Sequence, residues 1–393
     1  MKNLSNAALN VTGQPMFRIL DQAEKLEREG KKIIHFELGE PKFETPKNII
    51  NATLAALKGG DTHYVNSFGK YELRTVVQQT TLSSRGFKPD IDQILVTPGA
   101  NAIIFLAMTC LVNSGEEVIA PDPGFPTYLS AAQLTGAKLV PVPLYESNHF
   151  RLNPDDLRSK ITPKTRLIII NSPSNPTGAM MNPEELIEIA KIAEENDIYI
   201  LSDEIYGRMV FGEPEKFFSL GIHDQCKKRT IIANGFSKAF AMTGWRLGVA
   251  IGPKKIIEKM MLVVQTINSC VPPFIQEGGI EAIKGDKSAL KEMMESYKTN
   301  KDYLVKHLNL IKGITCLDPK GAIYVFPNIT GTGMSSDEFA QYILFECGIA
   351  VLPGNNFGSH GEGYVRLSYT TSLELITEAV EKLKKLFGVK LNA

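Results

Sequence analysis

Five short runs of mainly apolar residues divide the middle of this 393-residue chain, and segments with helical spacing separate them. They are Ile94–Val96, Glu117–Ala120, Leu167–Ile170, Ile198–Leu201 and Thr230–Ala233. Because the runs do not alternate apolar with polar residues, each strand should be buried on both faces of a sheet. Residues 183–195 show helical spacing, with Asn182 as the N-cap and Pro183 at the first helical position. This order predicts an α/β fold with a mainly parallel sheet flanked by helices.

The C-terminal third follows a different pattern. A long charged amphipathic helix is expected over residues 287–310, and short strands interleaved with helices follow it. The expected strands are 323–326, 349–352 and 364–367, and the expected helices are 335–346 and 372–387. We therefore expect a large ligand-binding domain over residues 46–285. A smaller α+β domain should combine residues 1–45 with residues 286–393.

Composition argues against several classes of protein. Lys+Arg and Asp+Glu both number 43, so the charge balance gives no reason to expect nucleic acid or a membrane surface as partner. The five cysteines are odd in number and widely spaced, and neither they nor the six histidines show metal-ligand spacing. No apolar run approaches the length of a membrane span, and the N-terminus lacks a signal core. We expect a soluble, cytoplasmic enzyme without a metal.

Polar residues gather where the expected strands end. They are Gly99–Asn101, Asn171–Asn175, Asp203–Tyr206 and Ser237–Lys238. In an open parallel sheet, ligands bind beyond the carboxyl ends of the strands, so these groups should meet in one site. Each group taken alone is equally typical of a turn or a helix cap.

The segment Ser237–Gly248, SKAFAMTGWRLG, closely resembles the cofactor-lysine motif of class I pyridoxal-phosphate-dependent aminotransferases, the aspartate aminotransferase family of fold type I. Four further blocks resemble motifs of that family in the same order: GEP at 39–41, SPSNPTG at 172–178, SDEIY at 202–206 and YVRLS at 364–368. Five ordered blocks over nearly the whole chain are far more specific than one. The resemblance implies a pyridoxal 5'-phosphate cofactor. It also implies ping-pong transfer of an amino group between an amino acid and a 2-oxo acid.

The resemblance assigns Lys238 as the residue that forms a Schiff base with the cofactor and then carries the substrate proton. Its apolar neighbours make it unlike an ordinary surface lysine. Asp203 should pair with the protonated ring nitrogen, since a buried aspartate without a cation is unfavourable. Asn175 and Tyr206 should hydrogen-bond the phenolic oxygen of the ring, and Phe125 should stack on the ring.

The phosphate group of the cofactor needs donors and positive charge. The resemblance assigns it to Arg246, to the hydroxyl of Ser237, and to the backbone of Gly99, Ala100 and Asn101 at a helix N-terminus. Tyr64 resembles a tyrosine that reaches the phosphate in the neighbouring subunit. We therefore expect a homodimer in which the two chains share their active sites.

Arg366 resembles the arginine that holds the substrate α-carboxylate in a forked pair, and the backbone of Gly39 should add a second contact. Related aspartate aminotransferases carry a lysine where this chain has Asn101, and a small hydroxyl residue where it has Gln14. Neither Asn101 nor Gln14 offers a charge to a distal carboxylate. A strict aspartate enzyme is therefore not expected. Alanine, aromatic, branched or more specialised donors, including amino or keto sugars, stay open, and so does glutamate if another cation pairs with it.

Two other functions share these motifs. A pyridoxal-phosphate-dependent C–S β-lyase, or another enzyme of fold type I, would carry the same residues around Lys238. A non-catalytic pyridoxal-phosphate-binding regulatory protein is the alternative of another class, although this chain has no appended DNA-binding segment. A nicotinamide dehydrogenase is not indicated, because no GxGxxG follows an expected strand.

Overall fold

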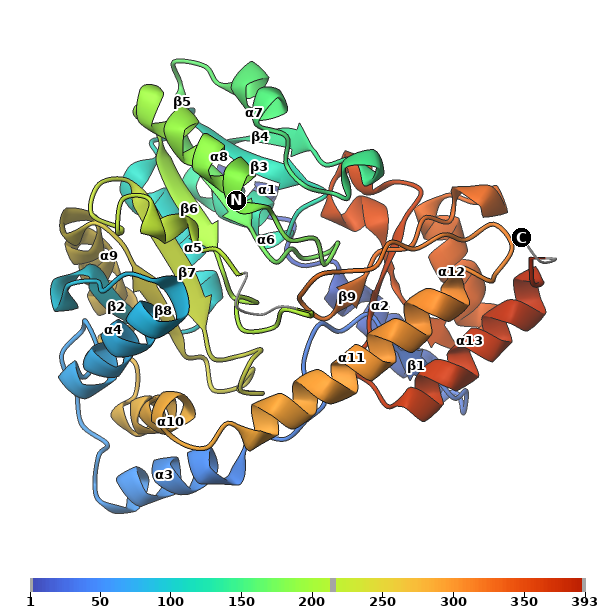
Figure 1. Cartoon of the computed structure of the whole chain (residues 1–393), viewed down its shortest axis with the longest axis horizontal. Helices are drawn as coiled ribbons and strands as arrows, with labels where there is room; N and C mark the ends of the chain where they lie inside the picture. Colours follow the sequence, from blue (N-terminus) through green and yellow to red (C-terminus); the bar gives the residue numbers. More distant parts are fainter. Residues whose placement is uncertain (1–2, 213–216, 391–393) are drawn as a thin grey trace.

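A computed structural model describes residues 3–212 and 217–390 of the protein. Its largest feature is a seven-stranded sheet with the strand order β2-β8-β7-β6-β5-β3-β4 (Figure 1). The strands are β2 (Ile94–Thr97), β3 (Glu117–Asp122), β4 (Lys138–Pro143), β5 (Thr165–Asn171), β6 (Tyr199–Asp203), β7 (Thr230–Gly235) and β8 (Gly248–Ile251). Strand β8 is antiparallel to both of its neighbours, and the other four pairings are parallel. The expected α/β fold with a mainly parallel sheet is confirmed.

Helices cover both faces of this sheet. The α-helices of the described chain, not all of which contact this sheet, are α1 (Asn6–Asn10), α2 (Met16–Arg28), α3 (Lys47–Lys58), α4 (Tyr71–Arg85), α5 (Ala100–Leu111), α6 (Thr127–Thr135), α7 (Pro154–Lys160), α8 (Pro183–Glu195), α9 (Lys254–Asn268), α10 (Pro273–Lys284), α11 (Ser288–Leu308), α12 (Ser336–Cys347) and α13 (Leu373–Phe387). In β5, Leu167 and Ile169 belong to the core with α5, α6 and α9. Ile168 and Ile170 belong to the core with α8. Successive residues thus face opposite layers, which explains the unbroken apolar runs.

Helix α8 illustrates how local sequence sets an element. It begins at a capping box, in which the side chains of Asn182 and Glu185 each accept a hydrogen bond from the other residue's backbone. Pro183 occupies the first turn, where its missing N–H has no intrahelical partner to lose. Its observed bounds match the expected 183–195.

Two smaller sheets join the ends of the chain. Strand β1 (Ile34–His35) pairs in parallel with β10 (Ile349–Ala350). Strand β12 (Val365–Ser368) pairs with both β11 (Leu352–Pro353) and β9 (Tyr324–Val325). The single strand expected over 349–352 is therefore divided between two sheets. In Figure 1, α11 runs from beside the large sheet to the region of α12 and α13. The expected domain boundaries stay a prediction.

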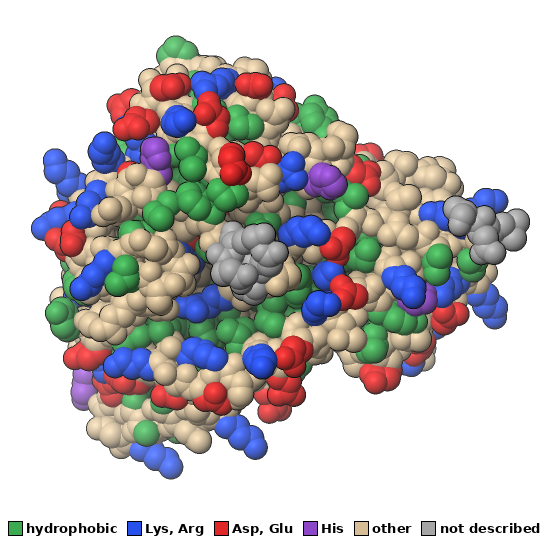
Figure 2. Space-filling view, in the orientation of Figure 1, with side chains coloured by type: hydrophobic (Ala, Val, Ile, Leu, Met, Phe, Trp, Pro, Cys, Tyr) green, Lys and Arg blue, Asp and Glu red, His purple; other side chains and the backbone are tan. Residues whose placement is uncertain are grey.

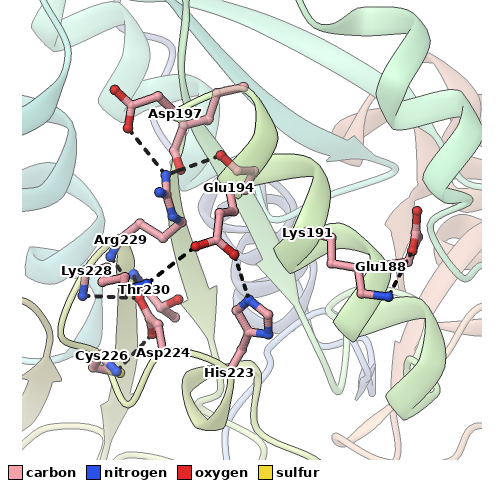
Figure 3. Close-up of polar contacts among 12 residues, drawn as sticks. Glu188, Lys191, Glu194, Asp197, His223, Asp224, Cys226, Lys228, Arg229 and Thr230 are labelled. Carbon is pink, nitrogen blue, oxygen red and sulfur yellow. Dashed lines mark hydrogen bonds and ion pairs between the residues drawn. The ribbon is translucent and has the colours of Figure 1, made fainter.

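A carboxylate orders the loop that enters β7. Asp224 accepts hydrogen bonds from the backbone N–H groups of Cys226, Lys228, Arg229 and Thr230 (Figure 3). These contacts satisfy donors that would otherwise need water at the start of a buried strand. Strand β7 leads directly to Ser237 and Lys238, so this loop helps to fix the position of the site.

The outer surface mixes both signs of charge. Figure 2 shows Lys and Arg side chains interspersed with Asp and Glu side chains over the face that it presents. Among residues 3–212 and 217–390, no helix has the length and apolar character needed to cross a membrane.

Candidate functional site

A cavity of about 160 Å³ lies at the carboxyl edge of the large sheet, beside the ends of β5 and β6. All but two of the residues expected at the site line it: Gln14, Gly39, Ala100, Asn101, Phe125, Asn175, Asp203, Tyr206, Ser237, Lys238, Arg246 and Arg366. It is also lined by Asn171 and Ile205, which belong to the groups expected at strand ends, and by Met16, Ile104, Thr243 and Tyr324, which have no expected role. Segments more than 300 residues apart in sequence thus meet at one place.

Lys238 lies on the turn that follows β7 and extends its amine into this cavity. The Nζ atom donates a hydrogen bond to the carbonyl oxygen of Gly39. Burial lowers the pKa of the amine, and the positive charges of Arg366 and Arg246 add to this effect. At neutral pH, the amine of Lys238 is therefore uncharged more often than the amine of an exposed lysine. The uncharged amine is the form that attacks a carbonyl carbon.

Asp203, the last residue of β6, is buried beside the same cavity. Its Oδ2 atom accepts a hydrogen bond of 2.8 Å from the hydroxyl of Tyr128, and its Oδ1 atom accepts one of 3.3 Å from the N–H of Ile205. Burial raises the pKa of Asp203 to about 6, even though both hydrogen bonds act in the opposite direction. The carboxylate is therefore suited to a cationic partner from a ligand.

Arg246 and the start of α5 form a second polar wall. Gly99, which precedes α5, has φ +85°, and a Cβ atom there would lie 2.4 Å from Nη2 of Arg246. Glycine thus allows the guanidinium to approach the helix N-terminus closely. The backbone of Arg246 is itself left-handed at φ 55°, a strained conformation for a non-glycine residue. A guanidinium beside the N–H groups of a helix start is a favourable arrangement for a phosphate.

Arg366, in β12, is fully buried and lines the same cavity. Its Nη1 atom donates to Oδ1 of Asn175 at 3.1 Å, and its Nη2 atom donates to the carbonyl oxygen of Glu37 at 2.5 Å. Its Nε atom has no hydrogen-bond partner among the described residues. The guanidinium also lies over the ring of Tyr324, 4.3 Å from the centroid. Arg366 is thus a buried cation whose hydrogen-bond partners are neutral and whose Nε–H donor is still available. Such a group can bind an anionic ligand.

Tyr324 is the most prominent residue that sequence reasoning missed. Its hydroxyl lies 2.8 Å from the hydroxyl of Tyr206. A Cβ atom on Gly39 would lie 2.1 Å from the same hydroxyl, so a side chain at position 39 would displace it. Tyr128 was missed as well, although it belongs to the segment that carries Phe125, and the two rings pack edge to face. Only the fold brings these tyrosines to the motif residues.

Of four further expected residues, Asn101 and Gln14 line the cavity, whereas Gly99 and Tyr64 do not. Asn101 lies in the first turn of α5, and Nε2 of Gln14 donates to the hydroxyl of Thr127 at 3.2 Å. Gly99 lies behind Arg246 rather than on the cavity wall. Tyr64 is outside the cavity of its own chain and is 85% exposed.

Comparison with known proteins gives a consistent picture. The family model "Aminotransferase class I and II" matches residues 31–383. The chain is 41% identical to an aspartate aminotransferase of Pyrococcus horikoshii over 93% of both chains. It is 40% identical to aromatic-amino-acid aminotransferase 2 of Thermococcus litoralis over 98% of this chain and 99% of that one. The crystal structure of an aspartate aminotransferase from Thermus thermophilus with maleate superposes with a TM-score of 0.93, at 31% identity, over 98% of this chain and all of that one.

Proposed function

The chain belongs to the class I and II aminotransferase family, and we propose that it transfers the amino group of an amino acid with a neutral side chain to a 2-oxo acid. The resemblance seen in the five sequence blocks is thereby confirmed: the protein is a pyridoxal-phosphate-dependent aminotransferase of fold type I. The donor amino acid, the ping-pong order of the reaction and the roles of individual residues are the proposal. The relatives include both aspartate and aromatic enzymes, so family membership alone does not choose the donor.

The residues of the cavity fit pyridoxal phosphate in three respects. Among the described residues, no cation pairs with the buried carboxylate of Asp203, and a protonated pyridine nitrogen would provide one. Arg246 and the start of α5 form a cradle of donors for the phosphate, and Gly99 keeps that cradle open. The amine of Lys238, whose pKa is lowered by burial, would bond to the aldehyde carbon. Each feature concerns a different part of the cofactor.

When bound, pyridoxal phosphate supplies an electron sink that stabilises negative charge at the substrate α-carbon. The protein supplies the remaining functions. Arg366 would hold the substrate carboxylate through its guanidinium, and so would fix the orientation of the α-carbon. The Nζ atom of Lys238 would remove the α-proton and later return it, acting as base and then as acid. The ionised carboxylate of Asp203 would keep the ring nitrogen protonated.

The charge of the cavity lining supports a neutral donor. Its cations are Lys238, Arg246 and Arg366, and each is already assigned to the cofactor or to the α-carboxylate. Asp203, the acidic residue of the lining, is assigned to the cofactor ring, and the other lining side chains are neutral. They include the amides of Gln14 and Asn101 and the apolar groups of Met16, Ile104 and Ile205. Apolar walls bind aromatic or large aliphatic side chains, whereas an unpaired distal carboxylate would be unfavourable there.

A half-reaction assay tests this proposal. The holoenzyme is mixed separately with phenylalanine, leucine, alanine and aspartate, and the visible absorbance of the bound cofactor is followed. We expect phenylalanine and leucine to convert the cofactor faster than aspartate at equal concentration. Asn101→Lys should raise the relative rate with aspartate by about tenfold or more, as expected for a new ion pair in a desolvated site.

The matched control is Asn113→Lys, which adds the same charge in an exposed position beyond the other end of α5. It should leave the order of rates unchanged. Equal rates with aspartate and phenylalanine in the wild-type protein, or an Asn101→Lys variant with unchanged preference, would contradict the proposed donor class.

We also propose a homodimer with shared active sites. Tyr64 is 85% exposed, and its place outside the cavity of its own chain suits a contact with the phosphate site of a second chain. Tyrosine is enriched at protein interfaces, where its ring is buried and its hydroxyl can still form a hydrogen bond.

A reducing compartment such as the cytoplasm is the proposed location. All five cysteines carry free thiols in the structure, and Cys226 and Cys316 are buried. Burial raises the pKa of the Cys316 thiol to about 12, so this thiol stays protonated and unreactive. Free thiols are typical of proteins in reducing surroundings.

A further inference from the structure

A histidine–carboxylate pair, in which the carboxylate of Glu37 is buried and the ring of His35 is partly exposed, lies next to Arg366. His35 is in β1 and Glu37 follows two residues later, so both side chains project from the same side of an extended segment. The Nδ1 atom of His35 lies 2.8 Å from Oε1 of Glu37, and its Nε2 atom lies 3.2 Å from Oε1 of Glu27 in α2. Glu37 is fully buried, and its Oε2 atom has no hydrogen-bond partner among the described residues. Among the described residues, the ring of His35 is the one hydrogen-bond partner of this carboxylate, and the charge of Arg366 acts on it as well.

Glu37 is also the residue that holds Arg366. Its carbonyl oxygen accepts the 2.5 Å hydrogen bond from Nη2 of the guanidinium. Burial lowers the pKa of Arg366, and the negative charge of Glu37 is among the groups that oppose this effect. Glu37 thus fixes the guanidinium through its backbone and acts on the charge of the guanidinium through its side chain.

We propose that His35 and Glu37 are positioning residues that set how strongly Arg366 attracts the carboxylate of the substrate. When His35 is protonated, its charge compensates that of Glu37, and Arg366 attracts an anion with most of its own charge. When His35 is neutral, the uncompensated charge of Glu37 opposes binding of a second carboxylate. The inference rests on the proposed role of Arg366.

The pair makes this attraction depend on pH. The other titratable groups that face it or the guanidinium are Glu27 of α2, Tyr324 of β9, Tyr206, which follows β6, and Lys238, which follows β7. The hydrogen bond to Glu37 raises the pKa of His35 to about 9, with smaller support from Glu27 and against the effect of burial. His35 is therefore protonated at neutral pH and loses its proton as the pH rises through about 9. Carboxylate binding should weaken over that range, in which an ordinary carboxylate stays ionised.

Calorimetric titration of the holoenzyme tests the inference. The probes are hydrocinnamate and isocaproate, carboxylates without an amino group that cannot enter the reaction. For the wild-type protein, we expect the Kd of the probe to rise about tenfold between roughly pH 7 and pH 10. His35→Gln should bind weakly across this range, because Glu37 stays uncompensated. Glu37→Gln should bind tightly across it, because the opposing charge is gone. The two substitutions should therefore change the Kd in opposite directions, whereas loss of a purely structural pair would weaken binding in both variants.

A second readout follows the histidine itself. Ring-labelled histidine NMR of the holoenzyme, assigned with His35→Gln, should show that a saturating probe raises the pKa of His35, because coupling between two sites is reciprocal. The control is His223→Gln, which removes a ring that lies 3.6 Å from Glu194 on the surface (Figure 3). It should leave both the Kd and its pH dependence unchanged.

Three results separate the possible failures. If His35→Gln and Glu37→Gln weaken binding equally, and the pKa of His35 does not respond to the probe, the inference is wrong. If Arg366→Gln binds the probes as tightly as the wild-type protein, the assignment of Arg366 to the carboxylate fails. Lost binding in Arg366→Gln together with an unresponsive His35 rejects the inference alone and leaves the proposed function standing.

Discussion

At the scale of single residues, Asp203 shows the conflict between stability and function. Its carboxylate receives two hydrogen bonds but pairs with no cation in the part of the chain that the structure describes, and burial raises its pKa to about 6 from 3.8. Between about pH 4 and pH 6, the folded protein without cofactor therefore holds a proton on Asp203 that the unfolded chain has already released. The contribution of this group to folding is favourable below about pH 4 and is lost as the pH rises toward 6.

Asp203→Asn should consequently stabilise the cofactor-free protein while it weakens cofactor binding. We expect a gain of about 1–3 kcal/mol in the free energy of unfolding at pH 7–8, and no gain near pH 4. Urea denaturation at the two pH values measures the first effect, and absorbance titration with pyridoxal phosphate measures the second. A variant that is less stable than the wild-type protein at pH 7 would show that the carboxylate is compensated in the absence of cofactor.

The motif residues were accessible from the sequence because each lies in a recognisable block. The sequence pattern predicts Lys238, Asp203 and Asn175 at strand ends, and the structure brings them to one cavity. Tyr324 and Glu37 were not foreseen, since each acts through contacts that depend on how distant segments pack. Their local sequence contains no spacing that distinguishes them from ordinary core residues.

At the scale of elements, the predictable parts were those with strong local signals. Helix α8 has a capping box and a proline at its start, and its observed bounds match those expected from the sequence. Strand β4 was not foreseen, because Pro141 and Pro143 remove backbone donors, a pattern that is tolerated only at the edge of a sheet. The division of residues 349–352 between β10 and β11 depends on tertiary pairing, which no local pattern encodes.

The junction between β2 and α5 gives a prediction of its own. Gly99→Ala should destabilise the fold by about 1 kcal/mol through its positive φ and should also displace Arg246, so cofactor affinity should fall by about tenfold or more. Gly115→Ala is a matched control, because Gly115 has φ +83° but an added Cβ there meets nothing within 4 Å. It should show the loss of stability alone. Equal cofactor affinities in the two variants would contradict the cradle assigned to the phosphate.

At the scale of the whole molecule, the site joins distant parts of the chain. Arg366 comes from a strand near the C-terminus, and Gly39 from the segment just after β1. The pairing of β1 with β10 brings those parts together, so the substrate side of the cavity depends on the small sheets. The seven-stranded sheet supplies Asp203 and leads into Lys238. The change in sequence pattern after residue 286 predicts a division into two domains, and that division stays a prediction.

A shared active site can be tested by mixing variants. Chains with Lys238→Ala and chains with Tyr64→Ala are each expected to have low activity. After the two are unfolded together and refolded, half of the dimers should be mixed, and each should contain one intact site, giving about a quarter of the wild-type activity. Light scattering should confirm the dimer. Activity no higher than the mean of the two parent variants would contradict a contribution of Tyr64 across the interface.

The central claim is that Lys238 carries the cofactor, and borohydride reduction followed by peptide mass mapping tests it most directly. Reduction should abolish the visible absorbance and leave a pyridoxyl phosphate group on the peptide that contains Lys238, while Lys238→Ala treated in the same way should carry no label. A label on a different lysine, or unchanged labelling in the Lys238→Ala variant, would contradict the assignment.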